Sequence, residues 1–250
     1  MKDCNYFCVG DIHGWDTALQ ELLDAVNFDY EKDVLVSLGD LCDRGPRSWE
    51  VIEILLKIKE LVLIQGNHDI WLKSYLNSKR RYCDYSWHSN GGQSTLKSYY
   101  DHNYANEAAH LKLLKSAVPY HEMDMDLFKE DAHPNARYCF THGGFNRKHY
   151  VKDHDGESMA WDRTLVEESM SCSPEQILKT KDGFDKVFVG HTPTLCWYES
   201  VPGYGNRPIT TPIIKGGVYN LDTGCGKFGK LTLYNLRTDT YIQTKETFGY

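Results

Sequence analysis

The stretch Gly39-Asp40-Leu41-Cys42-Asp43-Arg44-Gly45-Pro46 decides the fold of this 250-residue chain. It follows residues 34–38, an apolar run that is typical of a buried strand because it is short, rich in branched side chains and ended by glycine. Asp40, Asp43 and Arg44 then lie close together in a turn that glycine and proline shape. A carboxylate at the end of a buried strand needs a cation nearby, because desolvation of a lone charge is costly. Taken alone, the octet is equally compatible with a surface ion pair.

Two neighbouring segments repeat this arrangement. Apolar residues 6–9 end at Gly10-Asp11-Ile12-His13-Gly14, and apolar residues 61–64 end at Gly66-Asn67-His68-Asp69. Residues 16–26 and 49–58, between these strands, show helical spacing of their apolar side chains, so the order predicts a parallel β-α-β-α-β unit. His13 precedes Asp40 by 27 residues, and Asp40 precedes Asn67 by 27. We therefore expect the three polar clusters at one edge of the sheet, where open α/β sheets bind ligands.

The rest of the chain predicts a single domain over residues 1–250 with two unusual segments. Residues 70–136 are polar and helical in pattern and predict a helical insertion, and residues 193–217 predict a long loop. Both carry aromatic residues, so we expect them to select the substrate without taking part in the chemistry. Strands are predicted at 137–141, ending in His142, and at 186–189, ending before His191; residues 218–222, 230–235 and 240–244 predict a closing antiparallel set.

Composition excludes several classes of protein. Hydrophobic content of 41% and charged content of 25% are those of an ordinary globular protein. Apolar runs are too short to cross a membrane, and the first residues lack the apolar core of a signal peptide, so we expect a cytoplasmic protein with no membrane partner. A net charge of −7 without a long basic tract argues against a nucleic-acid partner. The eight scattered cysteines predict reduced thiols rather than a disulfide framework or a thiolate zinc site.

Five predicted strand ends carry metal-ligand side chains. One such end is more often an ordinary turn, but five at one sheet edge indicate a metal centre; they carry Asp11 and His13, Asp40, Asn67 and His68, His142, and His191. Carboxylate, imidazole and amide ligands without thiolate suit manganese, iron or zinc better than a calcium cage. Six ligands are too many for one tetrahedral zinc and suit two ions about 3.5–4 Å apart that share a carboxylate. Asp40, in the middle cluster, is the natural bridge.

These residues, in this order, resemble the calcineurin-like metallophosphoesterases, and within them the phosphoprotein phosphatase branch with its small single-domain bacterial and phage enzymes. The matching motifs are Gly-Asp-x-His-Gly, Gly-Asp-x-x-Asp-Arg-Gly, Gly-Asn-His-Asp/Glu, His-Gly and Gly-His-Thr, at residues 10–14, 39–45, 66–69, 142–143 and 190–192. The resemblance covers nearly the whole chain. It implies an α/β fold in which helices flank a sandwich of two mixed β-sheets.

The resemblance also implies a role for each matching residue. Asp11, His13 and Asp40 would hold one divalent ion, most simply Mn²⁺, and Asp40, Asn67, His142 and His191 would hold the other. His68 matches the catalytic histidine, Asp43 its acidic partner and Arg44 a phosphate-binding arginine. Trp161-Asp162-Arg163 resembles the element that supplies a second phosphate-binding arginine, Arg163. Trp87-x-x-Asn90-Gly91-Gly92 and Leu221-Asp222-Thr223-Gly224 look like further family elements, to which we assign helix initiation and sheet packing.

The predicted reaction is hydrolysis of a phosphomonoester by a hydroxide that bridges two metal ions, with His68 protonating the leaving group. A serine/threonine protein phosphatase acting on phosphorylated proteins is the favoured interpretation. Gln65-Gly66-Asn67-His68-Asp69 departs from the Arg-Gly-Asn-His-Glu that is common in those phosphatases, and Gly-Asn-His-Asp also occurs in symmetrical diadenosine tetraphosphatases. A dinucleoside polyphosphate hydrolase is therefore the alternative. A binding scaffold without catalysis is a third possibility, and the complete ligand set argues against it.

Overall fold

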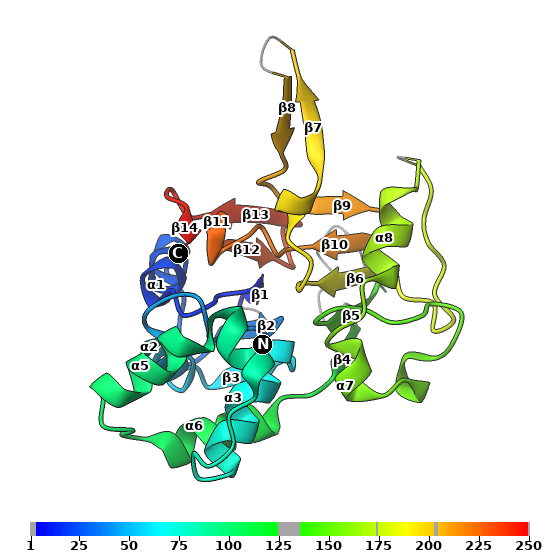
Figure 1. The fold of residues 1–250 in the computed structure, drawn as a ribbon. Helices are drawn as coiled ribbons and strands as arrows, with labels where there is room; N and C mark the ends of the chain where they lie inside the picture. The colour runs from blue at the N-terminus through cyan, green and yellow to red at the C-terminus, as the bar shows by residue number, and fades with distance from the viewer. Residues whose placement is uncertain (1–3, 125–135, 174, 203–204, 250) are drawn as a thin grey trace.

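Two five-stranded sheets pack face to face in the computed structural model, with helices on both outer faces (Figure 1). The structure describes residues 4–124, 136–173, 175–202 and 205–249. Each sheet combines parallel and antiparallel strands. The predicted α/β sandwich of two mixed sheets flanked by helices is therefore confirmed.

The first sheet has the order β13-β12-β1-β2-β3. Its parallel part consists of β1 (Tyr6–Val9), β2 (Val34–Ser37) and β3 (Glu60–Leu63), which confirms the predicted β-α-β-α-β unit. Antiparallel β12 (Thr232–Asn235) and β13 (Thr240–Gln243) extend it beyond β1.

The second sheet has the order β4-β5-β6-β10-β9. Its parallel centre is formed by β5 (Arg137–Thr141), β6 (Lys186–Val189) and β10 (Val218–Asn220), between the antiparallel edge strands β4 (Tyr120–Asp124) and β9 (Ile213–Lys215). The expectation that β10 forms a closing antiparallel set with β12 and β13 was wrong, since β10 lies in the second sheet, parallel to β6 and antiparallel to β9. Parallel strands are joined by long crossover connections, so the local sequence around β10 does not predict that it pairs with β6.

Alternation along the strands divides the apolar side chains between three layers. Phe7 and Val9 of β1 pack under the helices of the first sheet, whereas Cys8 points into the space between the sheets. In the second sheet Phe188 of β6 points into that same central layer, and its neighbour Val187 faces the opposite helices. The period of two residues thus builds the sandwich directly from the sequence.

Helices cover both outer faces (Figure 1). The first sheet is covered mainly by α1 (Asp16–Ala25), α2 (Ser48–Leu55), α3 (Asn67–Asn77), α5 (Gln93–Asp101) and α6 (Glu107–Ser116). A short α4 (Tyr85–Trp87) leads through a π-turn, His88–Gly92, into α5. The second sheet is covered by α7 (Gly156–Met159) and α8 (Thr164–Met170), with short 3-10 turns at Val151–Asp153 and Thr194–Cys196.

Two predicted segments need correction. The helical insertion ends at Ser116 rather than near residue 136, because residues 120–124 form the edge strand β4; residues 125–135 lie outside the described residues. The predicted loop 193–217 contains the hairpin of β7 (Tyr198–Val201) and β8 (Gly205–Pro208), which projects from the body in Figure 1, and the edge strand β9. Most residues of this hairpin are exposed, so no buried face imposed an alternating pattern that could have revealed it. A further small pair joins β11 (Lys227–Gly229) to β14 (Phe248–Gly249).

All eight cysteines lie in the described part of the chain and carry free thiols, as predicted. Five of them are buried, whereas Cys83 and Cys196 are exposed. Within the described ranges, every helix is too short or too polar to span a bilayer.

Candidate metal centre

The loops that follow the strands bring the predicted ligands together between the two sheets. Asp11, Asp40 and Asn67 follow strands of the first sheet, and His142 and His191 follow strands of the second. The ligands were expected at the edge of a single sheet, and the structure instead places them where the ends of the two sheets meet. Five site residues have left-handed backbone conformations, with φ of 49° at His13, 52° at Asp40, 74° at Asp43, 67° at Arg44 and 65° at His191. Such strain in residues other than glycine is concentrated at functional sites.

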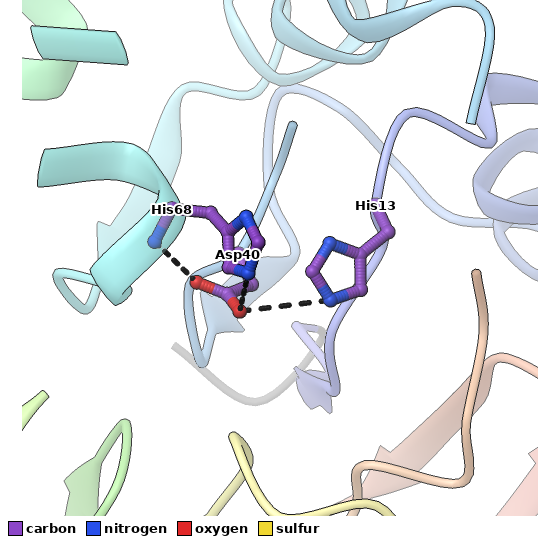
Figure 2. Close-up of side chains that lie close together, drawn as sticks. All are labelled: His13, Asp40 and His68. Atoms are coloured by element: carbon purple, nitrogen blue, oxygen red, sulfur yellow. Dashed lines mark hydrogen bonds and ion pairs between the residues drawn. The ribbon is translucent and has the colours of Figure 1, made fainter. Parts of the chain in front are cut away.

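Asp40 occupies the middle of the cluster and is 2% exposed. Figure 2 shows its carboxylate between the rings of His13 and His68, whose Nε2 atoms lie 3.6 and 3.9 Å from Oδ2. The other oxygen, Oδ1, accepts the backbone N–H of His68 at 3.0 Å and lies 3.2 Å from Nε2 of His142. Each oxygen of Asp40 therefore lies beside a different set of candidate metal ligands, as expected for a carboxylate that is shared by two metal ions.

Asn67 is the centre of a second group. Its Oδ1 lies 3.1 Å from Nε2 of His142 and 2.9 Å from Nδ1 of His191. The backbone N–H of His191 points at both oxygens of Asp11, at 3.3 and 3.1 Å. A Cβ atom on Gly190 would lie 2.1 Å from Asp11 Oδ1, so only glycine lets this strand end approach the carboxylate.

Backbone carbonyls orient two of the imidazole rings. Nδ1 of His13 donates to the carbonyl oxygen of Cys42 at 2.9 Å, and Nδ1 of His142 donates to that of Leu38 at 2.7 Å. A carbonyl only accepts, so Nδ1 carries the proton in both rings and Nε2 is directed into the site. This second layer of contacts fixes the tautomer and ring orientation that a metal-binding histidine needs.

The electrostatics of the cluster favour a cation. Burial works against a charged His142, but Asp40 and Asp11 overcome it and raise the pKa of His142 to about 10. Burial likewise opposes the charge of Asp40, and yet the surrounding histidines hold its pKa well below the ordinary value. Burial and the neighbouring His142 lower the pKa of His191 to about 2, so this ring is neutral. The site thus combines buried negative charge with at least one neutral imidazole donor.

These residues fit divalent ions. Nε2 of His191 is buried and has no hydrogen-bond partner among the described residues, although a buried polar atom normally has one. Two groups have ligand atoms within 4.8 Å of one another, namely His13, Asp40 and His68, and Asp40, His142 and His191. Nitrogen and carboxylate oxygen donors without sulfur suit borderline metals.

His68 and the arginines lie beside this cluster. Nδ1 of His68 donates to Oδ2 of Asp43 at 2.5 Å, and its Nε2 lies 3.1 Å from Nη2 of Arg44. Arg44 Nη1 also donates to Nε2 of His13. Arg163 donates from Nη1 to Thr192 Oγ1 at 3.0 Å, one residue from His191. The structure therefore brings the candidate ligands together with His68, Asp43 and Arg44, and places Arg163 beside the residue that follows His191.

Other residues of the site were missed by the sequence analysis. Asp69 accepts backbone N–H groups of Asp40, Leu41 and Gly66 at 2.8, 2.9 and 3.1 Å, and thereby holds the turn that carries Asp40. Asp69 is the last residue of the Gly-Asn-His-Asp motif, and this position could have indicated that it belongs to the site. Asp222, which we assigned to sheet packing, is a buried carboxylate close enough to Asp11 to raise the pKa of that residue, after the larger effect of burial.

An aromatic wall also escaped prediction. The rings of His68, Trp71, Trp161 and His191 follow one another, with centroids 5.1, 5.3 and 6.0 Å apart. Trp161 is 43% exposed, so this wall offers an apolar surface beside the ligand cluster. The sequence placed Trp161 only in the element that carries Arg163, and nothing in the local pattern around Trp71 distinguishes it from a core residue.

Comparisons with known proteins agree with this geometry. The chain is 43% identical to the symmetrical bis(5'-nucleosyl)-tetraphosphatase of Coxiella burnetii over 68 residues, which are 27% of this chain and 23% of that protein. It is 25% identical to serine/threonine-protein phosphatase 2 of Escherichia coli over 232 residues, 92% of this chain and 91% of that one. The solved metallophosphoesterase of Sphaerobacter thermophilus has the same fold, with a TM-score of 0.51, 15% identity and coverage of 97% and 88% of the two chains. The family description of the calcineurin-like phosphoesterases matches residues 5–208, and the chain belongs to this family.

Proposed function

We propose that this protein is a metal-dependent phosphoester hydrolase, and specifically a serine/threonine protein phosphatase. The observation that carries the proposal is the pairing of His68 with Asp43 directly beside the buried cluster centred on Asp40. A binding scaffold would need the ligands but would have no use for a histidine that a buried carboxylate orients towards them.

Two divalent ions are the proposed cofactors. Imidazole, amide and carboxylate donors suit manganese, iron or zinc, and Mn²⁺ is the identity that we favour. Asp11, His13 and Asp40 would hold one ion, and Asp40, Asn67, His142 and His191 the other. When bound, such ions supply Lewis acidity at the phosphoryl oxygens and lower the pKa of a bound water.

The chain's own side chains would handle the substrate and a proton. Arg44 lies beside both His13 and His68, where a planar guanidinium can bind two phosphoryl oxygens at once. Arg163 approaches from the side of His191 and would neutralise further phosphoryl charge. With Arg44 turned to the phosphoryl oxygens, Nε2 of His68 is free to take a proton from solvent. As the P–O bond breaks, this doubly protonated ring would donate its Nε2 proton to the departing alkoxide oxygen, leaving a neutral imidazole that solvent reprotonates. Such general acid catalysis contributes roughly 10²–10⁴-fold.

Phosphorylated proteins or peptides are the proposed substrates. Similarity to the Escherichia coli phosphatase extends over 92% of this chain, whereas the more identical tetraphosphatase match extends over 27%. The Gly-Asn-His-Asp motif and the higher identity of the tetraphosphatase match make diadenosine tetraphosphate the competing candidate. The eight free thiols support a reducing compartment, and we propose the cytoplasm. We also propose that residues 1–250 form one domain, because strands from both ends of the chain share the first sheet.

Turnover of a phosphoseryl peptide should be compared with turnover of diadenosine tetraphosphate, both with added Mn²⁺. A higher kcat/KM for the peptide supports the protein phosphatase, and a higher value for the dinucleotide transfers the assignment to the alternative. Inactivity towards both, and towards p-nitrophenyl phosphate, in a folded and metal-loaded protein would leave the scaffold as the remaining interpretation.

The role of His68 needs its own experiment. His68→Asn should lower kcat with little change in KM, because proton donation occurs in the transition state. The loss should be greater for a phosphoseryl peptide than for p-nitrophenyl phosphate, whose leaving group departs without a proton. Equal losses on both substrates would refute the general acid, and loss of one ion would make His68 a ligand.

A further inference from the structure

The carboxylate of Asp43 is held by two side chains of the helical insertion. Trp87 Nε1 donates to both oxygens of Asp43, at 2.9 Å to Oδ1 and 2.8 Å to Oδ2. Thr95 Oγ1 donates to Oδ1 at 2.6 Å and accepts the backbone N–H of Asp43 at 2.8 Å. His68 Nδ1 occupies the remaining position on Oδ2. All of these groups are buried, and Asp43 is 0% exposed.

A buried carboxylate requires such donors, since an unpaired charge away from water is strongly disfavoured. Their arrangement also has a geometric consequence. The indole N–H bridges the two oxygens and so fixes the plane of the carboxylate, while Thr95 occupies Oδ1. Oδ2 is thereby presented to His68, and the hydrogen bond from Nδ1–H to Oδ2 directs Nε2 of His68 towards Asp40 and Arg44.

We propose that Trp87 and Thr95 are positioning residues for the proton donor, acting on His68 through Asp43. This inference rests on the proposed function, because it takes His68 to be the general acid. It assigns to the insertion a task in the chemistry, where the sequence suggested substrate selection alone and helix initiation for Trp87. Neither residue touches the substrate or the metal ligands in this scheme.

The insertion is fastened to the same turn at a second point. The carbonyl oxygen of Gly91 accepts the backbone N–H of Arg44 at 3.1 Å. Gly91 has φ of +103°, and a Cβ atom there would lie 2.8 Å from that nitrogen. The π-turn therefore lies directly against residues 43–44, which gives Trp87 and Thr95 a defined distance from Asp43.

The substitutions Trp87→Phe and Thr95→Val each remove the side-chain hydrogen bonds to Asp43 and preserve most of the side-chain volume. Both should lower kcat for a phosphoseryl peptide by about tenfold, a part of what a general acid contributes, and leave p-nitrophenyl phosphate within about twofold. KM and metal content should stay unchanged. Thr95→Ser keeps the hydroxyl and should restore most of the peptide activity.

Matched controls come from the neighbouring helices. Trp49→Phe removes an indole donor to the carbonyl oxygen of Ala105, and Ser98→Ala removes a buried hydroxyl one turn after Thr95 on α5. Neither residue contacts Asp43, so both variants should retain the wild-type ratio of peptide to p-nitrophenyl phosphate activity. A lowered ratio in the controls would show that general loosening of α5 causes the effect, and it would overturn the proposal.

The decisive measurement repeats Trp87→Phe and Thr95→Val in the His68→Asn background. If both residues act through His68, they should cause no further loss on the peptide there. Full additivity, or equal losses on the two substrates in the single variants, would refute positioning. His68→Asn alone reports on the general acid itself: if it does not distinguish the substrates, the proposed mechanism fails and this inference fails with it. If His68→Asn distinguishes the two substrates and the Trp87 and Thr95 variants do not, the general acid stands and only the positioning role of Trp87 and Thr95 fails.

Discussion

Asparagine at position 69 should loosen the turn that carries Asp40. Asp69 is 2% exposed, and its two oxygens accept three backbone N–H groups, from Asp40 and Gly66 on Oδ2 and from Leu41 on Oδ1. Burial, and then the charge of Asp40, raise the pKa of Asp69 to about 6, so the side chain is a carboxylate at pH 8. Asp69→Asn therefore removes a buried charge together with an acceptor.

The size of the effect follows from these three bonds. In its best orientation the amide oxygen replaces Oδ2 and keeps two of them, while the amide NH₂ faces the N–H of Leu41. One backbone donor and one amide group are then buried without acceptors, at about 1–3 kcal/mol each. We expect a loss of about 2–6 kcal/mol in the free energy of unfolding. Turnover should also fall, by about a hundredfold if Asp40 moves by 1 Å.

Urea unfolding at pH 8 in the presence of a chelator measures the free energy of unfolding without a contribution from metal binding. Asp155→Asn is the matched control, since Asp155 is an exposed N-cap that accepts the N–H of Ser158 at 2.8 Å. Asparagine caps a helix about as well, so this variant should remain within about 0.5 kcal/mol of wild type. An Asp69→Asn protein with equally small destabilisation and normal turnover would show that the three bonds do not hold the turn.

Metal removal, truncation of the hairpin, loss of an arginine and acidification test other parts of the molecule. Chelation should abolish turnover and Mn²⁺ should restore it, with Asp40→Asn the most damaging ligand variant; two retained ions and normal turnover in Asp40→Asn would exclude the bridge. Shortening the exposed hairpin of β7 and β8 should change the preference between peptide and dinucleotide and leave p-nitrophenyl phosphate turnover within about tenfold, roughly 1.4 kcal/mol; collapse on every substrate would contradict this. Arg163→Ala should raise KM as well as lower kcat, because the guanidinium binds the ground state too, and an unchanged KM would refute that placement. Burial lowers the pKa of His110, so the unfolded chain binds the proton more readily and stability should fall as the pH drops below about 6.5; urea unfolding at pH 7 and 5 should show a weaker pH dependence for His110→Gln, and identical dependence would exclude this contribution.

Short-range patterns were sufficient for the core of the fold. Strands β1, β2 and β3 were predicted within one residue at each end because a short apolar run and the glycine that follows it are signals carried by neighbouring residues. The ligand set was predictable for the same reason, since each ligand lies shortly after a strand, whether it follows β1, β2, β3, β5 or β6. The spacing of 27 residues then placed the first three clusters together.

The amino-acid sequence by itself thus determined the strand order of the parallel unit, the helices between the strands and the candidate ligands, because all of these depend on local periodicity and on residue type. The tertiary structure decided the rest. It set β10 beside β6, paired β7 with β8 in an exposed hairpin, and brought Trp87 and Thr95 to Asp43 across 44 and 52 residues of chain. It also imposed left-handed backbone on Asp40, Asp43 and Arg44, a strain that only the surrounding packing can sustain. Contacts across such separations depend on how layers pack, and no local pattern records which distant donor will meet a buried carboxylate.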